Sequence, residues 1–342
     1  MSTCAFITGV SGPALSPAER EFLRTQRPWG FILFKRNIET PLQIATLVRE
    51  LRDSIGQPEA PVLIDQEGGR VQRLGPPHWP VYPSGALFGV LYDRDPALGL
   101  SAARLSARLI AADLADLGIT VDCLPLADMP VAGADAVIGN RAYGTEPKKV
   151  AAIGRAVTEG LEQGGVLPVL KHIPGHGRAT ADTHFRLPEV DTPKTELERT
   201  DFAAFHPLAD LPMAMTAHVV FSALDPAHPA TTSATIIQQV IRGVIGFQGL
   251  LMSDDVSMNA LSGSIAERTR AIFAAGCDVV LHCNGKLDEM REVAAETPEL
   301  AGLAFDRARR ALASRKVPQA FDRVRARAEL DALLERAGIL GA

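Results

Sequence analysis

The sequence predicts a closed (β/α)8 barrel, and three observations support this fold class. Short apolar runs alternate with amphipathic helical stretches along the chain. There are eight of these runs, which is the number of parallel strands in a TIM-type barrel. Polar residues follow one run after another, as expected when the carboxyl ends of all strands meet on one face. An open doubly wound sheet is the structural alternative, but no Gly-x-Gly-x-x-Gly motif follows the first run.

Each predicted strand is a short apolar run bounded by polar or turn-forming residues. The strands are expected at residues 4–9, 30–34, 61–65, 119–124, 166–170, 213–218, 249–253 and 278–283. Helices are expected near residues 41–53, 96–117, 147–163, 194–208, 234–244 and 264–275. An earlier helix begins after Ser16, which forms a capping box with Glu19. Because the residues after Cys283 have a mostly helical pattern, we expect one barrel domain over residues 1–342.

Composition narrows the class of protein. A net charge of −5 argues against a nucleic-acid binder, which usually has a basic excess. No stretch approaches the ~20 apolar residues that span a membrane, and the N-terminus lacks the pattern of a signal peptide. The cysteines lie in or beside apolar runs without zinc-type spacing, so we expect four buried free thiols at Cys4, Cys123, Cys277 and Cys283. We therefore expect a cytoplasmic protein with no nucleic-acid or membrane partner.

The most informative stretch is residues 166–188, VLPVLKHIPGHGRATADTHFRLP. It begins as an apolar strand, which we expect to end where the charged pair Lys171-His172 begins, and continues into a loop with Gly and Pro. That loop carries His176, Asp182 and His184. Packing alone does not explain so many titratable residues at the end of one buried strand. Loops at strand ends are common positions for catalytic groups, so we interpret this stretch as part of an active site.

Other predicted strands also end in charged residues. Asp65 and Arg73 flank a double glycine after the third strand, and Arg141 follows the fourth. Asp65 and Arg73 could form a simple ion pair, but a carboxylate at a barrel strand's carboxyl end is well placed to bind sugar hydroxyls. The seventh strand runs directly into Asp254 and Asp255. Adjacent strand residues point to opposite faces, so only one of these carboxylates is expected to face the barrel mouth.

Three segments together resemble the bacterial β-N-acetylglucosaminidases of glycoside hydrolase family 3. They are DQEGGRVQR at 65–73, KHIPGHG with DTHFRLP at 171–188, and GLLMSDDVSM at 249–258. The resemblance is greatest to the short, single-domain cytoplasmic type that recycles peptidoglycan. The departures from the family pattern remove no reactive group: Phe, Ser, Leu and Phe are more usual where this chain has Ile173, Thr183, Val256 and Tyr143.

This resemblance implies a retaining hydrolase that removes terminal non-reducing N-acetylglucosamine and needs no metal or cofactor. Asp254 matches the family's nucleophile, which forms a covalent glycosyl-enzyme. His184 matches a histidine acid/base on the loop after the fifth strand, with Asp182 as its partner. The i, i+2 spacing places Asp182 and His184 on the same side of an extended chain.

The resemblance also implies a sugar-binding set and two supporting residues. The residues that match the set around the non-reducing sugar are Asp65, Arg73, Arg141, Lys171 and His172. His176 is expected to support the loop, and Asp255 to support Asp254. The implied partner is a small carbohydrate or muropeptide, such as N-acetylglucosaminyl-1,6-anhydro-N-acetylmuramic acid with or without its peptide.

Three alternatives remain open from the sequence. A metal-dependent barrel hydrolase could use His172, His176, Asp182 and His184 as ligands, although the HxH pair common after a first strand in that class is absent. A non-catalytic sugar-binding barrel would not need Asp254 or His184. A related β-N-acetylglucosaminide phosphorylase is the third alternative, because a histidine acid/base does not repel phosphate as a carboxylate would.

Overall fold

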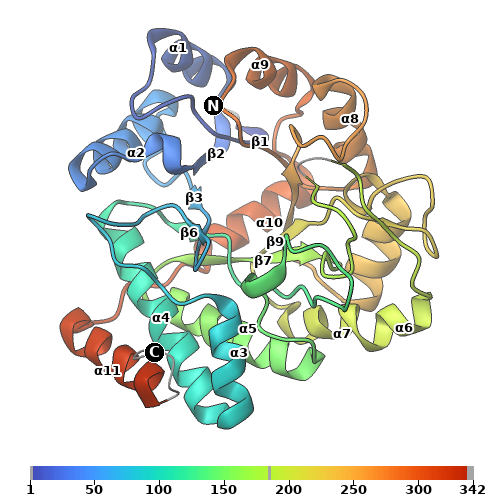
Figure 1. Cartoon of the computed structure of the whole chain (residues 1–342). Coiled ribbons are helices and arrows are strands. Elements are labelled where there is room, and N and C mark those ends of the chain that lie inside the picture. Colours follow the sequence, from blue (N-terminus) through green and yellow to red (C-terminus); the bar gives the residue numbers. More distant parts are fainter. Residues whose placement is uncertain (1–2, 184–185, 337–342) are drawn as a thin grey trace.

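A closed barrel of eight parallel strands forms the centre of the described chain, residues 3–183 and 186–336, in the computed structural model (Figure 1). The order around the barrel is β1-β12-β11-β9-β7-β6-β3-β2. This confirms the predicted fold class. The barrel strands are β1 (Cys4–Thr8), β2 (Pro28–Leu33), β3 (Val62–Ile64), β6 (Val121–Asp122), β7 (Leu167–Ile173), β9 (Met213–Thr216), β11 (Leu250–Asp255) and β12 (Val279–His282).

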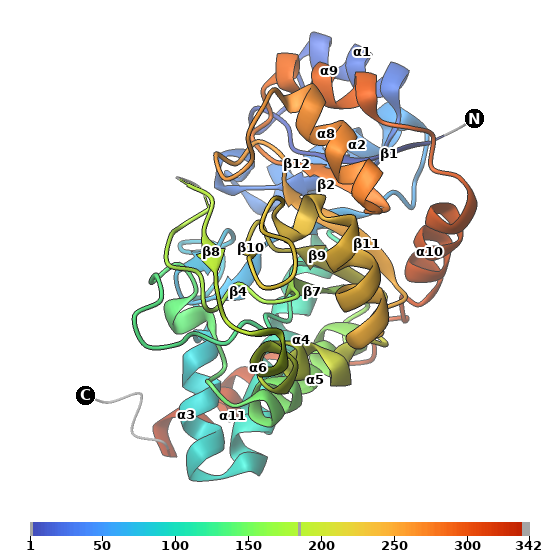
Figure 2. The same ribbon diagram turned by 90° about the vertical axis from the view of Figure 1, so that its right-hand side faces the viewer.

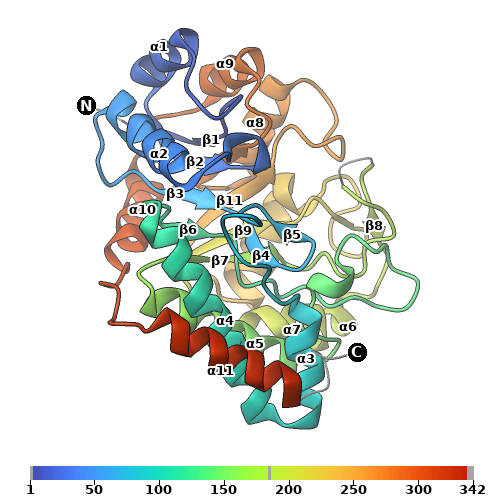
Figure 3. The same cartoon turned by 60° about the vertical axis from the view of Figure 1, so that its left-hand side comes forward.

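Helices surround the barrel, and Figure 3 shows the last of them crossing α4. None of the helices in the described ranges is long and apolar enough to cross a membrane. The α-helices are α1 (Pro17–Gln26), α2 (Pro41–Ile55), α3 (Gly85–Arg94), α4 (Pro96–Asp116), α5 (Pro147–Gln163), α6 (Lys194–Arg199), α7 (Asp201–Phe205), α8 (Ile265–Ala275), α9 (Leu287–Glu296), α10 (Gly302–Ala313) and α11 (Arg323–Arg336).

Alternation along the strands divides the core into two layers. One set of side chains, which includes Ile7, Leu63 and Met252, faces the barrel interior. The other set faces the helices. Ala308 and Ala311 of α10 pack with the interior set. Figure 2 shows α10 on the side of the barrel away from the loops around β4 and β8. The interior is therefore filled and closed at one end, which leaves the carboxyl ends of the strands for a binding site.

Several predicted boundaries were wrong. β7 continues through Lys171 and His172 to Ile173 instead of ending at residue 170, and β6 is only two residues long. The helix expected at 194–208 is divided by Thr200, whose ψ of −88° is not helical, into α6, α7 and a 3₁₀ turn, η3 (His206–Leu208). The helix expected at 234–244 is a π-helix, η5 (Ile236–Val244). The capping box of Ser16 and Glu19 is confirmed.

Short elements beyond the barrel strands add structure that periodicity did not predict. A hairpin of β4 (Gln66–Gly68) and β5 (Val71–Gln72) follows β3, and β8 (Glu189–Val190) pairs with β10 (Val220–Phe221). The hairpin turns at Gly68 and Gly69, whose φ angles of 93° and 58° favour glycine. Three further 3₁₀ turns are η1 (Lys35–Asn37), η2 (Gly139–Arg141) and η4 (Ala230–Thr232).

Helix α3 lies directly against the loop that carries Arg141. A Cβ atom on Gly85 would lie 2.1 Å from the carbonyl oxygen of Arg141, and one on Gly89 would lie 2.0 Å from that of Tyr143. These approaches are too short for any side chain. The two glycines, one helical turn apart, therefore let the helix backbone pack against the loop. This packing fixes the position of the Arg141 backbone, from which its side chain extends.

We predict that Gly85→Ala destabilises the protein. In an ordinary helix this change stabilises by roughly 0.5–1 kcal/mol. Here the added methyl group would push against the Arg141 carbonyl, so we expect a net loss of about 1–3 kcal/mol in the free energy of unfolding, measured by urea denaturation. Gly12→Ala is the control, because no atom lies within 4 Å of its added Cβ. Equal stability of both variants would contradict the close packing.

Candidate active site

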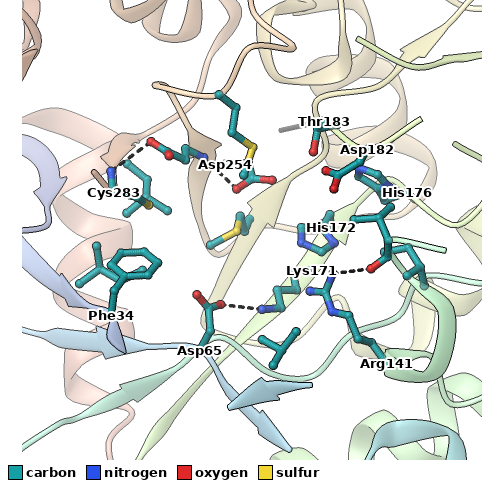
Figure 4. Close-up of a pocket in the computed structure, with 18 of the residues that line it drawn as sticks. Phe34, Asp65, Arg141, Lys171, His172, His176, Asp182, Thr183, Asp254 and Cys283 are labelled. Carbon is teal, nitrogen blue, oxygen red and sulfur yellow. Dashed lines mark hydrogen bonds and ion pairs between the residues drawn. The ribbon is translucent and has the colours of Figure 1, made fainter. Parts of the chain in front are cut away.

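A pocket of about 280 Å³ opens at the carboxyl ends of the barrel strands (Figure 4). Of the ten site residues that the sequence predicted, His184 lies outside the described residues. The other nine all line this pocket: Asp65, Arg73, Arg141, Lys171, His172, His176, Asp182, Asp254 and Asp255. The structure therefore brings together residues separated by up to 190 positions in the chain, as parallel strand ends in a barrel require.

Lys171 is at the centre of an ion-pair network on the pocket floor. Its side chain is 2% exposed, and Nζ lies 2.8 Å from Asp65 Oδ1 and 2.7 Å from Glu67 Oε1. Arg141 donates two hydrogen bonds of 2.8 Å to the two carboxylate oxygens of Glu67. Arg73 reaches Asp65 Oδ2 at 3.2 Å. Each carboxylate therefore meets both an ammonium and a guanidinium group.

These contacts keep the buried groups charged. Burial alone would raise the pKa of Asp65, but Lys171 and Arg73 outweigh it and hold that pKa well below its usual range. For Glu67, burial is likewise outweighed by Arg141 and Lys171, which lower its pKa to about 2. Burial would lower the pKa of Lys171, but the two carboxylates raise it well above its usual value. The floor thus presents fixed donors and acceptors, which suit the hydroxyl groups of a sugar.

Asp254 and Asp255 at the end of β11 have different surroundings. Figure 4 shows the Asp254 carboxylate directed into the pocket. Asp255 Oδ1 instead accepts hydrogen bonds from the backbone N–H groups of Cys283 and Ser257, both 3.0 Å long. The backbone N–H of Asp255 also donates to Asp254 Oδ1 at 2.8 Å. Asp255 is therefore held at the pocket edge by its own partners, while Asp254 keeps one oxygen for the pocket.

Asp254 is buried but ionised. Burial raises its pKa, but the charges of His218 and His172, together with the backbone N–H of Asp255, lower it to a value below the usual one. His218 itself is fully buried, and its ring contacts Thr231 Oγ1 at 2.7 Å and the Asp255 carbonyl at 3.0 Å. An ionised carboxylate with restricted hydration is the state that a carboxylate nucleophile requires.

Glu67 and Asp128 were not among the predicted site residues. Glu67 lies inside the DQEGGRVQR segment, and Asp128 follows the fourth predicted strand, so the rule that polar residues gather at strand ends could have identified both. Asp128 is fully buried and lies 2.7 Å from His172 Nδ1. His172 and His176 have ring centroids 5.5 Å apart. Burial, followed by the charge of His172, lowers the pKa of His176 to about 4.

The pocket also has apolar lining residues, and Figure 4 shows Phe34 and Cys283 on the side away from His172 and His176. The apolar residues include Ile32, Phe34, Met215, Met258, Leu281 and Cys283. The guanidinium groups of Arg36 and Arg73 lie 4.9 and 5.3 Å from the centroid of the Phe34 ring. The prediction of four buried thiols was wrong for Cys4 and Cys283, which are partly exposed, although all four cysteines are free. The pocket thus offers apolar contact as well as charge.

Most of the chain matches one known enzyme family. Residues 8–315 match the family described as "Glycosyl hydrolase family 3 N terminal domain". The chain belongs to glycosyl hydrolase family 3. It is therefore a glycoside hydrolase, which confirms the predicted enzyme class. Its curated relatives are named β-hexosaminidases.

Two of these relatives are similar over most of their length. A β-hexosaminidase of Alkalilimnicola ehrlichii is 38% identical over 280 residues, covering 81% of this chain and 79% of the relative. A β-hexosaminidase of Bordetella avium is 34% identical over 315 residues, covering 90% and 88%. Family 3 membership and a β-hexosaminidase-type activity are thus established.

Solved structures of family 3 proteins have the same architecture. NagZ from Neisseria gonorrhoeae, in complex with N-trifluoroacetyl-D-glucosamine, superimposes with a TM-score of 0.85 and 30% identity, covering 100% of this chain and 99% of NagZ. A β-N-acetylhexosaminidase from Beutenbergia cavernae gives a TM-score of 0.78 and 28% identity, covering 92% and 96%. Both proteins are similar in size to this chain, so the likeness includes the helices around the barrel.

We predict that Lys171→Met destabilises this family 3 enzyme strongly at neutral pH. The change leaves Asp65 and Glu67 buried with less compensating charge, so we expect a loss of about 3–5 kcal/mol in the free energy of unfolding. Lys286→Met is the matched control, because that lysine side chain is 70% exposed and pairs only at the surface with Glu289. A loss below ~1 kcal/mol for Lys171→Met would contradict the role of the network.

The loss of stability in Lys171→Met should depend on pH in a defined direction. The folded pKa of Glu67, about 2, lies below its unfolded value, so its ionisation stabilises the protein above pH ~4.3, and this contribution is lost as the pH falls towards 2. In Lys171→Met the folded pKa values of both carboxyls should rise. The deficit relative to wild type should therefore shrink between pH 7 and pH ~3. A constant deficit in urea titrations over that range would refute this coupling.

Proposed function

We propose that this chain is a retaining exo-β-N-acetylglucosaminidase that acts on peptidoglycan fragments. Its substrate would be a terminal non-reducing N-acetylglucosamine on 1,6-anhydro-N-acetylmuramic acid, with or without a peptide. The observation that carries the proposal is the ionised carboxylate of Asp254 in a pocket whose floor is the Lys171 network. The Neisseria NagZ structure contains a glucosamine derivative, which supports the same sugar class here. The cytoplasmic location predicted from the sequence is part of this proposal.

The pocket has a surface suited to each part of the sugar. Asp65, Arg141 and Lys171 would hold ring hydroxyls, with His172 and Arg73 at the sides. The methyl group of the acetamido substituent needs an apolar contact, and apolar lining residues such as Phe34 and Met215 can supply it. Because the charged groups are already paired with one another, they would need little rearrangement when the sugar binds.

The chemistry proposed for Asp254 has two steps. In the first, a carboxylate oxygen of Asp254 attacks the anomeric carbon, and the bond to the leaving oxygen breaks. His184, oriented by Asp182, would donate a proton to that oxygen. In the second, His184 would take a proton from water, which attacks the anomeric carbon and releases Asp254. Two inversions at one carbon give net retention of the anomeric configuration.

The central functional prediction concerns substrate class and acceptor. Purified protein should hydrolyse an aryl β-N-acetylglucosaminide at least ~10²-fold faster, in kcat/KM, than the matching aryl β-glucoside, because only the former has an acetamido group to contact the apolar side chains of the pocket. The product should be free N-acetylglucosamine both with and without inorganic phosphate, and a strong chelator should leave the rate unchanged. A sugar 1-phosphate as the main product would show phosphorolysis, and loss of activity with the chelator would support metal-dependent hydrolysis.

Replacement of the proposed nucleophile should abolish turnover without unfolding the protein. We expect Asp254→Asn to lower kcat by about 10⁴-fold or more, because the amide is nearly isosteric but cannot attack the anomeric carbon. A mechanism-based fluorosugar should label Asp254, as read by peptide mass spectrometry. Asp191→Asn, at an exposed position, is the control and should keep full activity. A label on Asp255 or Glu67 would overturn the assignment.

The rate losses caused by replacing His184 or Asp182, the proposed acid/base pair, should depend on the leaving group. His184→Ala should lose about 10²–10⁴-fold in rate with poor leaving groups and much less with nitrophenolate, which departs without a proton. Asp182→Asn should show the same trend at smaller amplitude. Azide should partly rescue His184→Ala and yield a β-glycosyl azide. Equal losses for good and poor leaving groups, with no azide product, would mean that His184 binds substrate without transferring a proton.

A further inference from the structure

Asp128 connects two histidines of the pocket through a single buried carboxylate. It follows β6, is fully buried, and accepts hydrogen bonds from the backbone N–H groups of His172, at 3.2 Å, and His176, at 2.6 Å. Its Oδ2 also lies 2.7 Å from His172 Nδ1. Three N–H groups therefore converge on Asp128, and they come from the end of β7 and from the turn that follows it.

The contact with Nδ1 fixes the ring of His172. Burial would raise the pKa of Asp128, but the charge and hydrogen bond of His172, followed by the charge and backbone N–H of His176, lower it below the usual value. An ionised carboxylate can only accept hydrogen bonds, so Nδ1 of His172 must carry a proton. The other ring nitrogen, Nε2, is then directed away from Asp128, and His172 lines the pocket.

The charged groups around His172 agree with this assignment. The His176 ring, in the turn after β7, has its centroid 5.5 Å from that of His172. Asp254 of β11 is close enough for its pKa to respond to His172, and the charge of Asp128 also reaches Arg141 at the end of η2. His176 does not compete for Asp128 with its ring, because only its backbone contacts that carboxylate. In the described part of the chain, Nδ1 of the His176 ring has no hydrogen-bond partner.

We propose that Asp128 is a positioning residue that fixes the tautomer and orientation of His172, so that Nε2 of His172 faces the sugar. Asp128 acts through the ring of His172; it is fully buried and does not line the pocket. The inference rests on the proposed function for the identity of the sugar, but the ring tautomer exists in the free enzyme. Carboxylates that orient metal-bound histidines change affinity or activity by about 10–100-fold, and we expect an effect of the same order here.

A double-mutant cycle tests whether Asp128 acts through His172. Asp128→Asn should lower kcat/KM for an aryl β-N-acetylglucosaminide by about 10–100-fold, because one N–H of the amide would face N–H donors. In a His172→Ala background the same change should lower it by less than about threefold, since the ring it orients is gone. Asp113→Asn is the control and should leave kcat/KM unchanged. Asp113 lies on α4, and its carboxylate accepts a hydrogen bond from the Tyr82 hydroxyl. Equal losses in both backgrounds would overturn the proposal, because Asp128 would then act on the fold in general.

A spectroscopic measurement keeps the proposal testable if Asp128→Asn fails to fold or the proposed sugar is wrong. Long-range ¹H–¹⁵N correlation spectra of the wild-type protein report which ring nitrogen of each histidine carries a proton. The His172 signals are identified by their loss in His172→Gln. We expect a protonated Nδ1 in the free enzyme, whatever its substrate. An unprotonated Nδ1 on His172 would refute the proposal, while failure of sugar hydrolysis with a protonated Nδ1 would count against the proposed function alone.

Discussion

The buried ammonium group of Lys171 is the interaction on which the rest of the site depends. A lysine whose side chain is 2% exposed can remain charged only where carboxylates replace its hydration, and Asp65 and Glu67 both do so. The two carboxylates carry one more negative charge than Lys171 can balance, and Arg141 and Arg73 compensate it by pairing with Glu67 and Asp65. Because the members come from β7, from the hairpin after β3 and from the loop after β6, the network also holds three strand ends in a fixed relation.

The barrel makes this concentration of charge possible. Its interior is filled with apolar side chains from all eight strands, so polar groups on inward-facing positions can gather only at the mouth. There the same geometry places an ionised Asp254 across the pocket from the network. Paired charges that are already in position need little reorganisation during a reaction, and this preorganisation is the main physical contribution that we assign to the site.

Short-range patterns predicted the barrel because each strand buries alternate residues and because parallel strands end on one face. They did not predict the partners of the pocket residues. Glu67 bonds Arg141 across 74 positions, and Asp128 bonds His172 across 44, so neither pairing leaves a local signal. The end of β7 was misplaced for the same reason. A Lys-His pair indicates the end of a buried strand unless the distant carboxylates that satisfy it are known.

The stereochemistry of the first product tests the account most directly. Proton NMR during the first minutes of hydrolysis of an aryl β-N-acetylglucosaminide distinguishes the two anomers of released N-acetylglucosamine before they interconvert. If Asp254 forms a covalent bond to the sugar, the β anomer should appear first, and the α anomer should follow only by mutarotation. Initial release of the α anomer would mean a single displacement by water, and would contradict the role of Asp254 as nucleophile.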